Sequence, residues 1–197
     1  DEGSGNVAKD LSGNGYDGKI TGAGWSIAKY GNGLYITGAN QYAEKDWNDF
    51  PISTVTIAFW LNPDTLNTGT SWKDLVGIYL HDDRTRFHLD SADNSIMWYN
   101  VYGGCGGLDS GVVPTAGQWY HVVGTHDGSI ARIYVNGEEK NSVSCSRSDI
   151  STGLVAGSDG EIFIGKIDEV QIYNRALSEE EIKNIYEGNL IAKNKGC

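Results

Sequence analysis

Hydrophobic and polar side chains alternate along most of this chain with the two-residue period of half-buried β-strands. In the segment at 54–63, for example, Val55, Ile57, Phe59 and Leu61 fall on one side. Because successive side chains of a strand point to opposite faces of a sheet, such a segment buries one face and exposes the other. The same pattern predicts further strands at 33–44, 74–82, 85–90, 95–102, 119–128, 131–140 and 161–173.

Tight turns and a single helix complete the pattern. An Asn-Gly pair at 136–137 separates two of the strands and predicts a two-residue hairpin. Helical periodicity occurs at 178–188, where Ser178 and Glu181 have the spacing of a capping box. A long series of strands with one short C-terminal helix predicts an all-β fold, a two-sheet antiparallel jelly-roll sandwich in which residues 1–197 form a single domain.

The balance of charges narrows the range of partners. The chain carries 26 Asp and Glu against 15 Lys and Arg, a formal net charge of −11. Nucleic acids and anionic membrane surfaces are bound through Lys and Arg, so this balance argues against both. Hard cations such as calcium are compatible with it. No apolar run approaches the ~20 residues that cross a bilayer, so we expect no membrane insertion.

Three cysteines are present, Cys105, Cys145 and Cys197, and none has the C-x-x-C spacing of a zinc site. One disulfide plus one odd thiol is the simplest arrangement. Cys105 and Cys145 both lie in the strand-rich middle of the chain, so we expect these two to pair. Cys197 is the last residue of the sequence and is left as a free or intermolecular thiol.

The segment DLSGNGYDG at 10–18 places many oxygen-bearing side chains on a glycine-rich stretch. Asp10, Ser12 and Asn14 occupy alternate positions followed by glycine, as in the first half of an EF-hand loop. The second half is absent, since Thr21 stands where the bidentate glutamate is needed. Two interpretations stay open. One is a calcium site completed by a residue from elsewhere in the chain, and the other is a polar turn without an ion, because Asp, Asn and Gly favour turns by themselves.

The strands at 74–102 offer a candidate ligand-binding face. If Val76 and Phe87 point into the core, the residues that alternate with them point outward and mix aromatic rings with hydrogen-bonding groups. The predicted outward set is Tyr79, His81, Arg86, His88, Trp98, Asn100 and Tyr102. Aromatic faces stack on the C–H surfaces of sugars, so this face would suit a glycan. Packing alone also places such residues in strands, and a one-residue shift in register would exchange the two faces.

Three segments together resemble a known family. They are DEGSGNVAKDLSGNGYDGKI at 1–20, GQWYHVVGTHDGSIARIYVNGE at 117–138 and GKIDEVQIYNRALSEEEIKNIYEG at 165–188. These segments resemble the laminin-G-like jelly-roll modules of the concanavalin A-like lectin/glucanase superfamily. The resemblance implies the sandwich fold over nearly the whole chain. Modules of this group serve as carbohydrate-binding appendages of enzymes, as adhesive parts of surface proteins and as spacers.

The resemblance also supplies a partner for the loop at 10–18. In such modules the residue matching Asp168 often lies beside the N-terminal loop. The calcium site predicted in this way consists of Asp10, Asn14, Asp17 and Asp168, and it would tie the loop to the last long strand. A hydrophobic strand normally precedes the segment with which this sequence begins. The resemblance therefore predicts an open sheet edge, available for strand addition by a neighbouring segment or subunit.

Catalysis is not expected. Related glucanases carry several acids on one strand, but the nearest match, KIDEVQ at 166–171, has Lys166 in place of the first glutamate and Gln171 where another acid would fall. Retaining glycosidases need two carboxylates about 5–5.5 Å apart.

We therefore expect a noncatalytic carbohydrate-binding module, extracellular or at the cell surface, with structural calcium and a polysaccharide or glycan partner. The alternative is a structural or adhesive module that contacts other domains or subunits, and a glycoside hydrolase is less favoured.

Overall fold

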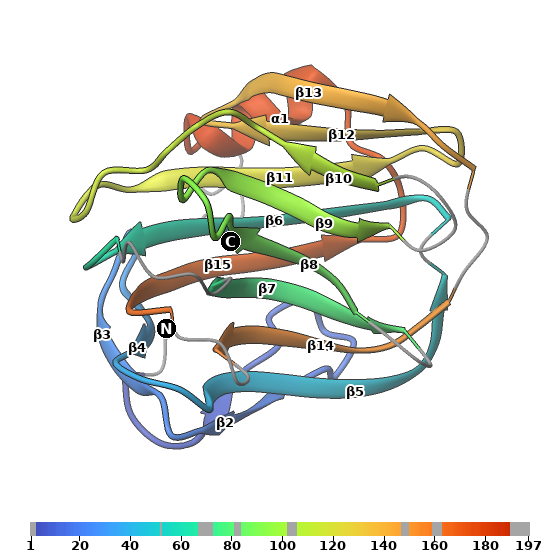
Figure 1. Ribbon diagram of the computed structural model, residues 1–197. Helices are drawn as coiled ribbons and strands as arrows, with labels where there is room; N and C mark the ends of the chain where they lie inside the picture. The colour runs from blue at the N-terminus through green and yellow to red at the C-terminus, as the bar shows by residue number, and fades with distance from the viewer. Residues whose placement is uncertain are drawn as a thin grey trace.

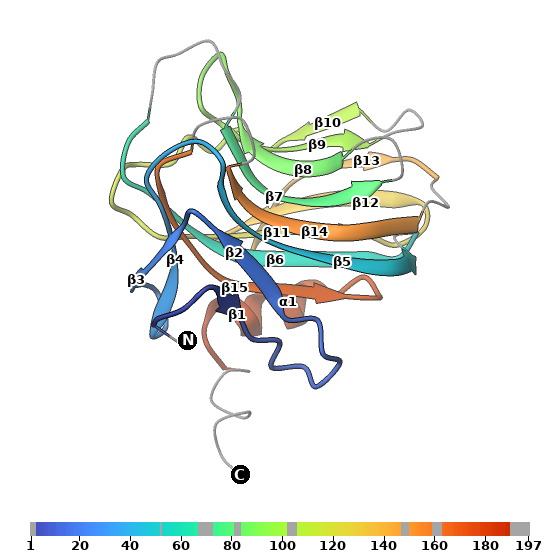
Figure 2. The same ribbon diagram turned by 90° about the horizontal axis from the view of Figure 1, so that it is seen from below.

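The computed structural model of the protein describes residues 3–51, 53–66, 73–80, 84–101, 106–146, 150–158 and 163–189. Within these ranges, fifteen strands form two antiparallel sheets, and one short helix follows them in the chain. Figure 1 shows the order of the strands, and Figure 2 shows the two sheets stacked face to face. The prediction of a two-sheet β-sandwich with one C-terminal helix is confirmed.

Each sheet combines strands that follow one another in the sequence with strands that are distant in it. The larger sheet runs in the order β1 (Val7–Ala8), β2 (Gly18–Thr21), β5 (Gln41–Pro51), β14 (Ile150–Ser158), β7 (Lys73–Leu80), β8 (Arg84–Leu89), β9 (Ile96–Val101) and β10 (Gly106–Asp109). The smaller sheet runs in the order β13 (Glu138–Ser144), β12 (Ile130–Val135), β11 (Tyr120–His126), β6 (Val55–Pro63), β15 (Gly165–Tyr173), β4 (Asn32–Ile36) and β3 (Gly24–Ile27). Consecutive strands such as β5 and β6 therefore lie in opposite sheets.

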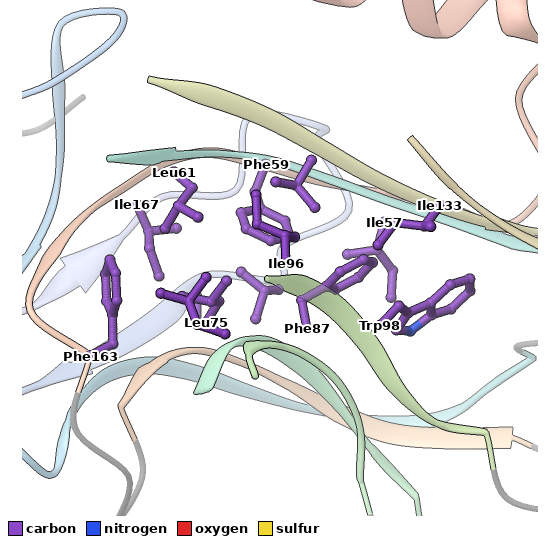
Figure 3. Close-up of a cluster of buried hydrophobic side chains, with 14 of the residues drawn as sticks. Ile57, Phe59, Leu61, Leu75, Phe87, Ile96, Trp98, Ile133, Phe163 and Ile167 are labelled. Atoms are coloured by element: carbon purple, nitrogen blue, oxygen red, sulfur yellow. The ribbon is translucent and has the colours of Figure 1, made fainter. Parts of the chain in front are cut away.

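The core lies between the two sheets, and Figure 3 shows its central side chains. Strand β6 sends Ile57, Phe59 and Leu61 inward, and none of the three is exposed to solvent. Phe87 and Ile96 meet them from the larger sheet. The alternation predicted for this strand is therefore confirmed, and burial of its apolar side chains drives the sheets together.

The other face of the smaller sheet is covered by α1 (Glu179–Tyr186), as Figure 2 shows. A second apolar cluster fills the space between the helix and the sheet. Its buried members are Ala58, Val123, Tyr134, Leu177, Ile182 and Ile185. Ser178 accepts a hydrogen bond from the Glu181 N–H, and the Glu181 carboxylate accepts one from the Ser178 N–H, so the predicted capping box is confirmed. No helix in the described part of the chain is long and apolar enough to cross a membrane.

The predicted hairpin joins β12 to β13. Val135 pairs with Glu138, which leaves Asn136 and Gly137 as the two loop residues. Their φ angles are 54° and 81°, in the left-handed region that a tight hairpin with the twist of its strands requires. The two-residue hairpin predicted from the Asn-Gly pair is therefore confirmed.

Candidate functional site

A pocket opens where the loop between β1 and β2 passes β5. It is lined by Gly15 and Tyr16 from the loop and by Lys45, Asp46 and Trp47 from the strand, and it encloses about 350 Å³. The rings of Tyr16 and Trp47 meet edge to face, with centroids 5.9 Å apart and planes at 70°. Tyr16 is 45% exposed, so its ring borders both the pocket and the solvent. Two aromatic residues, one cationic residue and one acidic residue thus line one open depression, and the two rings are in contact.

The pairing of β2 with β5 explains where this pocket forms. The two strands pair from Lys19 opposite Glu44 to Thr21 opposite Tyr42. Beyond Glu44, one edge of β5 still pairs with β14. The opposite edge, which paired with β2 up to that point, lies beside the loop between β1 and β2. Figure 2 shows this loop, in dark blue, projecting from the end of β2. Strand pairing therefore brings together two aromatic residues that are far apart in the sequence.

Hydrogen bonds inside the loop fix its shape. Asp10 Oδ1 accepts from the Ser12 N–H at 2.8 Å, and Asp10 Oδ2 accepts from the Tyr16 N–H at 2.9 Å. Asp17 Oδ1 accepts from the Asp10 N–H at 2.9 Å, and the Lys9 ammonium donates to Asp17 Oδ2. Hydrogen bonds, first from Ser12 and then from the Tyr16 amide, lower the pKa of Asp10 to about 2, and the Lys9 contact lowers the pKa of Asp17. Both carboxylates are therefore ionised at neutral pH.

Asp168, the fourth predicted calcium ligand, lies in a different environment. It is 6% exposed on β15, where its Oδ2 accepts from the Tyr30 N–H and its Oδ1 from the Glu169 N–H, both at 2.9 Å. Burial raises the pKa of Asp168, and the backbone N–H groups partly offset that effect. Asp168 thus fastens the turn between β3 and β4 to β15.

The structure does not bring Asp10, Asp17 and Asp168 together in one metal-ligating group. Calcium takes about six to eight oxygens, and in the structure the carboxylate oxygens of Asp10 and Asp17 accept N–H or ammonium groups. Asn14 donates its side-chain amide to Ser12 Oγ at 2.9 Å. Across the ranges that the structure describes, no three His, Cys, Asp or Glu side chains form a group that could hold a metal ion. Calcium binding by Asp10, Asn14, Asp17 and Asp168 stays a prediction from the sequence.

The prediction that Trp98 faces outward is wrong. Trp98 pairs with Phe87 across β8 and β9, is 3% exposed, and stacks on the Phe87 ring with centroids 5.3 Å apart and planes at 8°. Its neighbour Tyr99 reaches the outer face of the sheet instead and is 43% exposed. Residues 96–99 are apolar or aromatic at every position, so alternation does not distinguish the two faces.

Two other predicted residues do lie on the outer side of β8. Arg86 pairs with Tyr99, and His88 pairs with Met97. The His88 ring packs against Tyr99 with centroids 5.3 Å apart, but His88 itself is only 1% exposed. Burial, followed by the nearby Arg86, lowers the pKa of His88 to about 3, so the imidazole is neutral. His88 therefore packs beneath the exposed tyrosine and is shielded from solvent.

The rest of the predicted face cannot be compared with the structure. His81 and Tyr102 fall outside the described residues, and the side chains of Tyr79 and Asn100 are likewise outside the description. The same holds for Cys105, the predicted partner of Cys145. The disulfide between these two residues stays a prediction.

A buried aromatic cluster lies where α1 meets the smaller sheet. Trp60 stacks on Tyr186 with centroids 5.8 Å apart and lies 5.0 Å from the ring of His121. The Lys29 ammonium is 4.1 Å from the centroid of Trp60. His121 is 1% exposed, and burial, followed by Lys29, lowers its pKa to about 4. These contacts give His121 a packing role.

Sequence patterns alone do not predict the pocket at Tyr16 and Trp47. The available signal is an aromatic residue inside the polar, glycine-rich loop, since such a ring has few apolar neighbours in the sequence. Trp47 is likewise surrounded by charged and polar residues in the sequence, within EKDWND at 44–49. Only the pairing of β2 with β5 shows that the two rings meet.

Comparison with known families supports the architecture. A family model described as the concanavalin A-like lectin/glucanases superfamily matches residues 37–183, which is more than half of the chain. A comparison with curated proteins gave no match.

Several solved structures share the fold. The binding domain of Paraclostridial mosquitocidal protein 1 superposes with a TM-score of 0.76 at 20% identity, over 94% of this chain and 50% of that one. Domain 4 of the extracellular arabinanase AbnA from Geobacillus stearothermophilus, solved with arabinotriose, gives 0.67 at 21% identity, over 90% and 91%. Trypanosoma rangeli sialidase, solved with the inhibitor DANA, gives 0.67 at 20% identity, over 93% and 31%. This chain thus spans about half of the toxin domain, and at such identities the similarity shows the fold.

Proposed function

The chain belongs to the concanavalin A-like lectin/glucanase superfamily, and from this membership and the pocket between Tyr16 and Trp47 we propose that it is a noncatalytic carbohydrate-binding module. The pocket is the observation that carries the proposal. Among proteins of the same fold, the toxin domain is described as a binding domain, and the arabinanase domain was solved with a sugar. These two structures support a binding role, while the sialidase of the same fold makes catalysis an outcome to test.

The chemistry of the pocket suits a sugar, which presents both C–H faces and hydroxyl groups. The rings of Tyr16 and Trp47 would pack against the C–H faces. Lys45 would donate hydrogen bonds to hydroxyl groups, and Asp46 would accept them. The cavity of about 350 Å³ lies at the lower end of small-ligand sites, which span about 300–1,000 Å³. We therefore expect it to hold a short part of a glycan, such as a chain end.

Tyr99 marks a second candidate surface, on the outer face of the larger sheet. Its exposed ring lies beside Arg86 and packs on His88. This arrangement replaces the predicted face centred on Trp98. A flat tyrosine surface encloses a sugar less than the pocket does, so we rank it second.

A glycan array probed with the purified chain tests the proposal, first in calcium and then after chelation. We expect a defined set of bound glycans. Tyr16→Ala and Trp47→Ala should each weaken binding to the strongest of these at least about tenfold, or about 1.4 kcal/mol. Tyr99→Ala is the matched aromatic variant, and we expect it to leave that affinity unchanged.

Other outcomes assign the chain differently. If Tyr99→Ala, and not the pocket variants, abolishes binding, the outer sheet face is the site. If the folded chain binds no glycan, the carbohydrate-binding proposal fails and a structural or adhesive module becomes the better account. Release of reducing sugar from a bound glycan would identify a hydrolase instead.

Two finer parts of the proposal, the location and the disulfide, have their own measurements, and so does the calcium site predicted from the sequence. An extracellular or cell-surface location predicts that the native protein is found outside the cell. Loss of glycan binding on chelation would support a calcium ion. A Cys105–Cys145 disulfide predicts that reduction adds two hydrogens to the mass of the intact protein, and that the peptides carrying these residues are linked before reduction.

A further inference from the structure

The loop at 9–17 has two features that need a common explanation. It carries the oxygen-rich side chains from which the sequence predicts a calcium site, and it carries Tyr16, one wall of the pocket. We infer that Asp10 is a positioning residue that holds Tyr16 against Trp47 through hydrogen bonds within the loop, without a metal ion. The effect on sugar affinity rests on the proposed function, but the hydrogen bonds themselves can be tested without any ligand.

Asp10 reaches across the loop to the residue that forms the pocket wall. Its Oδ2 accepts from the backbone N–H of Tyr16 at 2.9 Å, while its Oδ1 accepts from the N–H of Ser12 at 2.8 Å. Both carboxylate oxygens are therefore used by amides of the same loop. Hydrogen bonds to an ionised acceptor are about twice as strong as those between neutral groups. One side chain thus fixes the backbone at the start and at the far side of the loop.

A second carboxylate closes the base of the loop. Asp17 Oδ1 accepts from the Asp10 N–H at 2.9 Å, and the Lys9 ammonium bonds Asp17 Oδ2. Asp17 comes directly before β2, and Lys9 directly follows β1, so this contact joins the ends of the two strands. The hydrogen bond from the Asp10 N–H to Asp17 thus fixes the Asp10 backbone, and with it the position of the Asp10 carboxylate.

Tyr16 depends on these bonds because the loop has little other support. Gly13 and Gly15 have φ angles of 84° and 78°, and in the described structure a Cβ on either would have no atom within 4 Å. Glycines in such open surroundings are not held by packing and sample many backbone conformations. The Tyr16 ring, 45% exposed, has Trp47 as an aromatic neighbour at 5.9 Å. Bonds from Asp10 therefore order the loop before a ligand arrives, which reduces the entropy lost on binding.

In the structure, the carboxylates of this loop bind donors of the chain itself. Asp10 directs both of its carboxylate oxygens at N–H groups, and Asp17 is bonded to an N–H and to the Lys9 ammonium. Asp168, which would complete a cage, bonds the turn at Tyr30 instead. Each carboxylate oxygen that accepts an N–H keeps a second lone pair, but a calcium ion at Asp17 would have to compete with the Lys9 ammonium. The loop is held by donors from its own sequence.

Backbone amide exchange tests the hydrogen bonds directly, without a ligand. Exchange rates of the Ser12 and Tyr16 amides are measured by NMR for the full chain and for Asp10→Ala, each in calcium and in EDTA. We expect slow exchange of both amides in the wild-type chain under both conditions, and faster exchange in the variant. If EDTA alone speeds the exchange of the wild-type chain as much as the substitution does, a calcium ion holds the loop and the inference fails. Unchanged rates in Asp10→Ala would also overturn it.

Sugar affinity tests the consequence for the pocket, with arabinotriose and the glycans of the array as probes. We expect Asp10→Ala to weaken binding about tenfold, with only a small decrease in melting temperature because the loop lies outside the core. Asp93→Ala is the matched control, since Asp93 makes the same kind of bond, to the Ser95 N–H at 2.8 Å, in the turn between β8 and β9. Asn14→Ala removes a predicted calcium ligand and keeps the Asp10 bonds, so it should bind like wild type.

The outcomes separate this inference from the proposed function. Faster exchange at Tyr16 with unaltered sugar affinity in Asp10→Ala would refute the positioning role. Equal losses in Asp10→Ala and Asn14→Ala, both reproduced by EDTA, would assign the loop to calcium. If the wild-type chain binds no sugar, the proposed function fails, while amide exchange still decides whether Asp10 holds Tyr16 without a metal ion.

Discussion

Replacing two adjacent residues of β9 distinguishes a core position from a surface position. The structure puts Trp98 inside the sandwich and Tyr99 outside it, opposite to the outward position that we predicted for Trp98 from the sequence. We therefore expect Trp98→Ala to destabilise the protein strongly and Tyr99→Ala to have little effect. Because the two residues are neighbours on one strand, each variant serves as the control for the other.

The magnitudes follow from burial and contacts. Trp98 is 3% exposed and stacks on Phe87 at 5.3 Å, and replacing such a core aromatic by alanine costs about 3–5 kcal/mol. For a chain of this size, 1 kcal/mol shifts the melting temperature by about 2–4 °C, so we expect a decrease of roughly 6–20 °C. Tyr99 is 43% exposed, and its replacement should change the free energy of unfolding by about 1 kcal/mol or less.

Urea denaturation followed by circular dichroism measures both effects, because it reports the unfolding midpoint and its dependence on denaturant. The free energy of unfolding should fall for Trp98→Ala with an unchanged m-value, since a changed m-value would indicate a different denatured or native state. A Trp98→Ala protein as stable as wild type would refute the placement of this residue in the core. A large loss for Tyr99→Ala together with a small one for Trp98→Ala would show that the register of β9 is shifted by one residue.

Three further predictions concern stability. The pKa of His121 is lowered to about 4, below the value near 6.5 in the unfolded chain. The neutral imidazole therefore stabilises the fold above pH 6.5, and this contribution of about 3 kcal/mol is lost as the pH falls toward 4. His121→Gln should remove about one proton from the pH dependence of unfolding, measured by urea titrations between pH 7 and pH 4.5. Ser178→Ala should cost about 1 kcal/mol through loss of the helix cap, and an unchanged urea midpoint would contradict that role. Gly124→Ala should lower the free energy of unfolding by about 1–3 kcal/mol, because its Cβ would lie 2.5 Å from Phe87 Cζ and 2.8 Å from Trp98 Cε3. A melting temperature equal to that of wild type would show that this close approach does not occur.

The parts of the fold that the sequence predicts are those with local signals. The alternation of Ile57, Phe59 and Leu61, the hairpin at 136–137 and the capping box at Ser178 all depend on residues within a few positions of one another. Each of these predictions is confirmed, because a short segment contains both the residues and the geometry that they impose. The family resemblance then supplies the sandwich fold into which these strands pack, and the structure supplies their order.

The candidate site depends on contacts that no local pattern contains. Tyr16 and Trp47 meet because β2 pairs with β5, and this pairing brings the loop beside the strand. The oxygen-rich loop is ambiguous for a different reason. Asp10 and Asp17 suit a calcium site and a self-bonded turn equally well, because a carboxylate oxygen can accept an N–H and still bind a cation, so their residue types do not decide between the two.

The register of β9 shows how a distant residue resolves a local ambiguity. Alternation gives no preference between Trp98 and Tyr99, because both are aromatic and either would fit a half-buried strand. Gly124, on the facing strand β11, removes the ambiguity, since the space that a side chain would fill there is occupied by the rings of Phe87 and Trp98. A glycine inside a strand often marks such a close approach. The glycine in WYHVVGTHDG at 119–128 therefore predicts a large ring opposite β11, and the pairing of β8 with β9 determines that Trp98 supplies it.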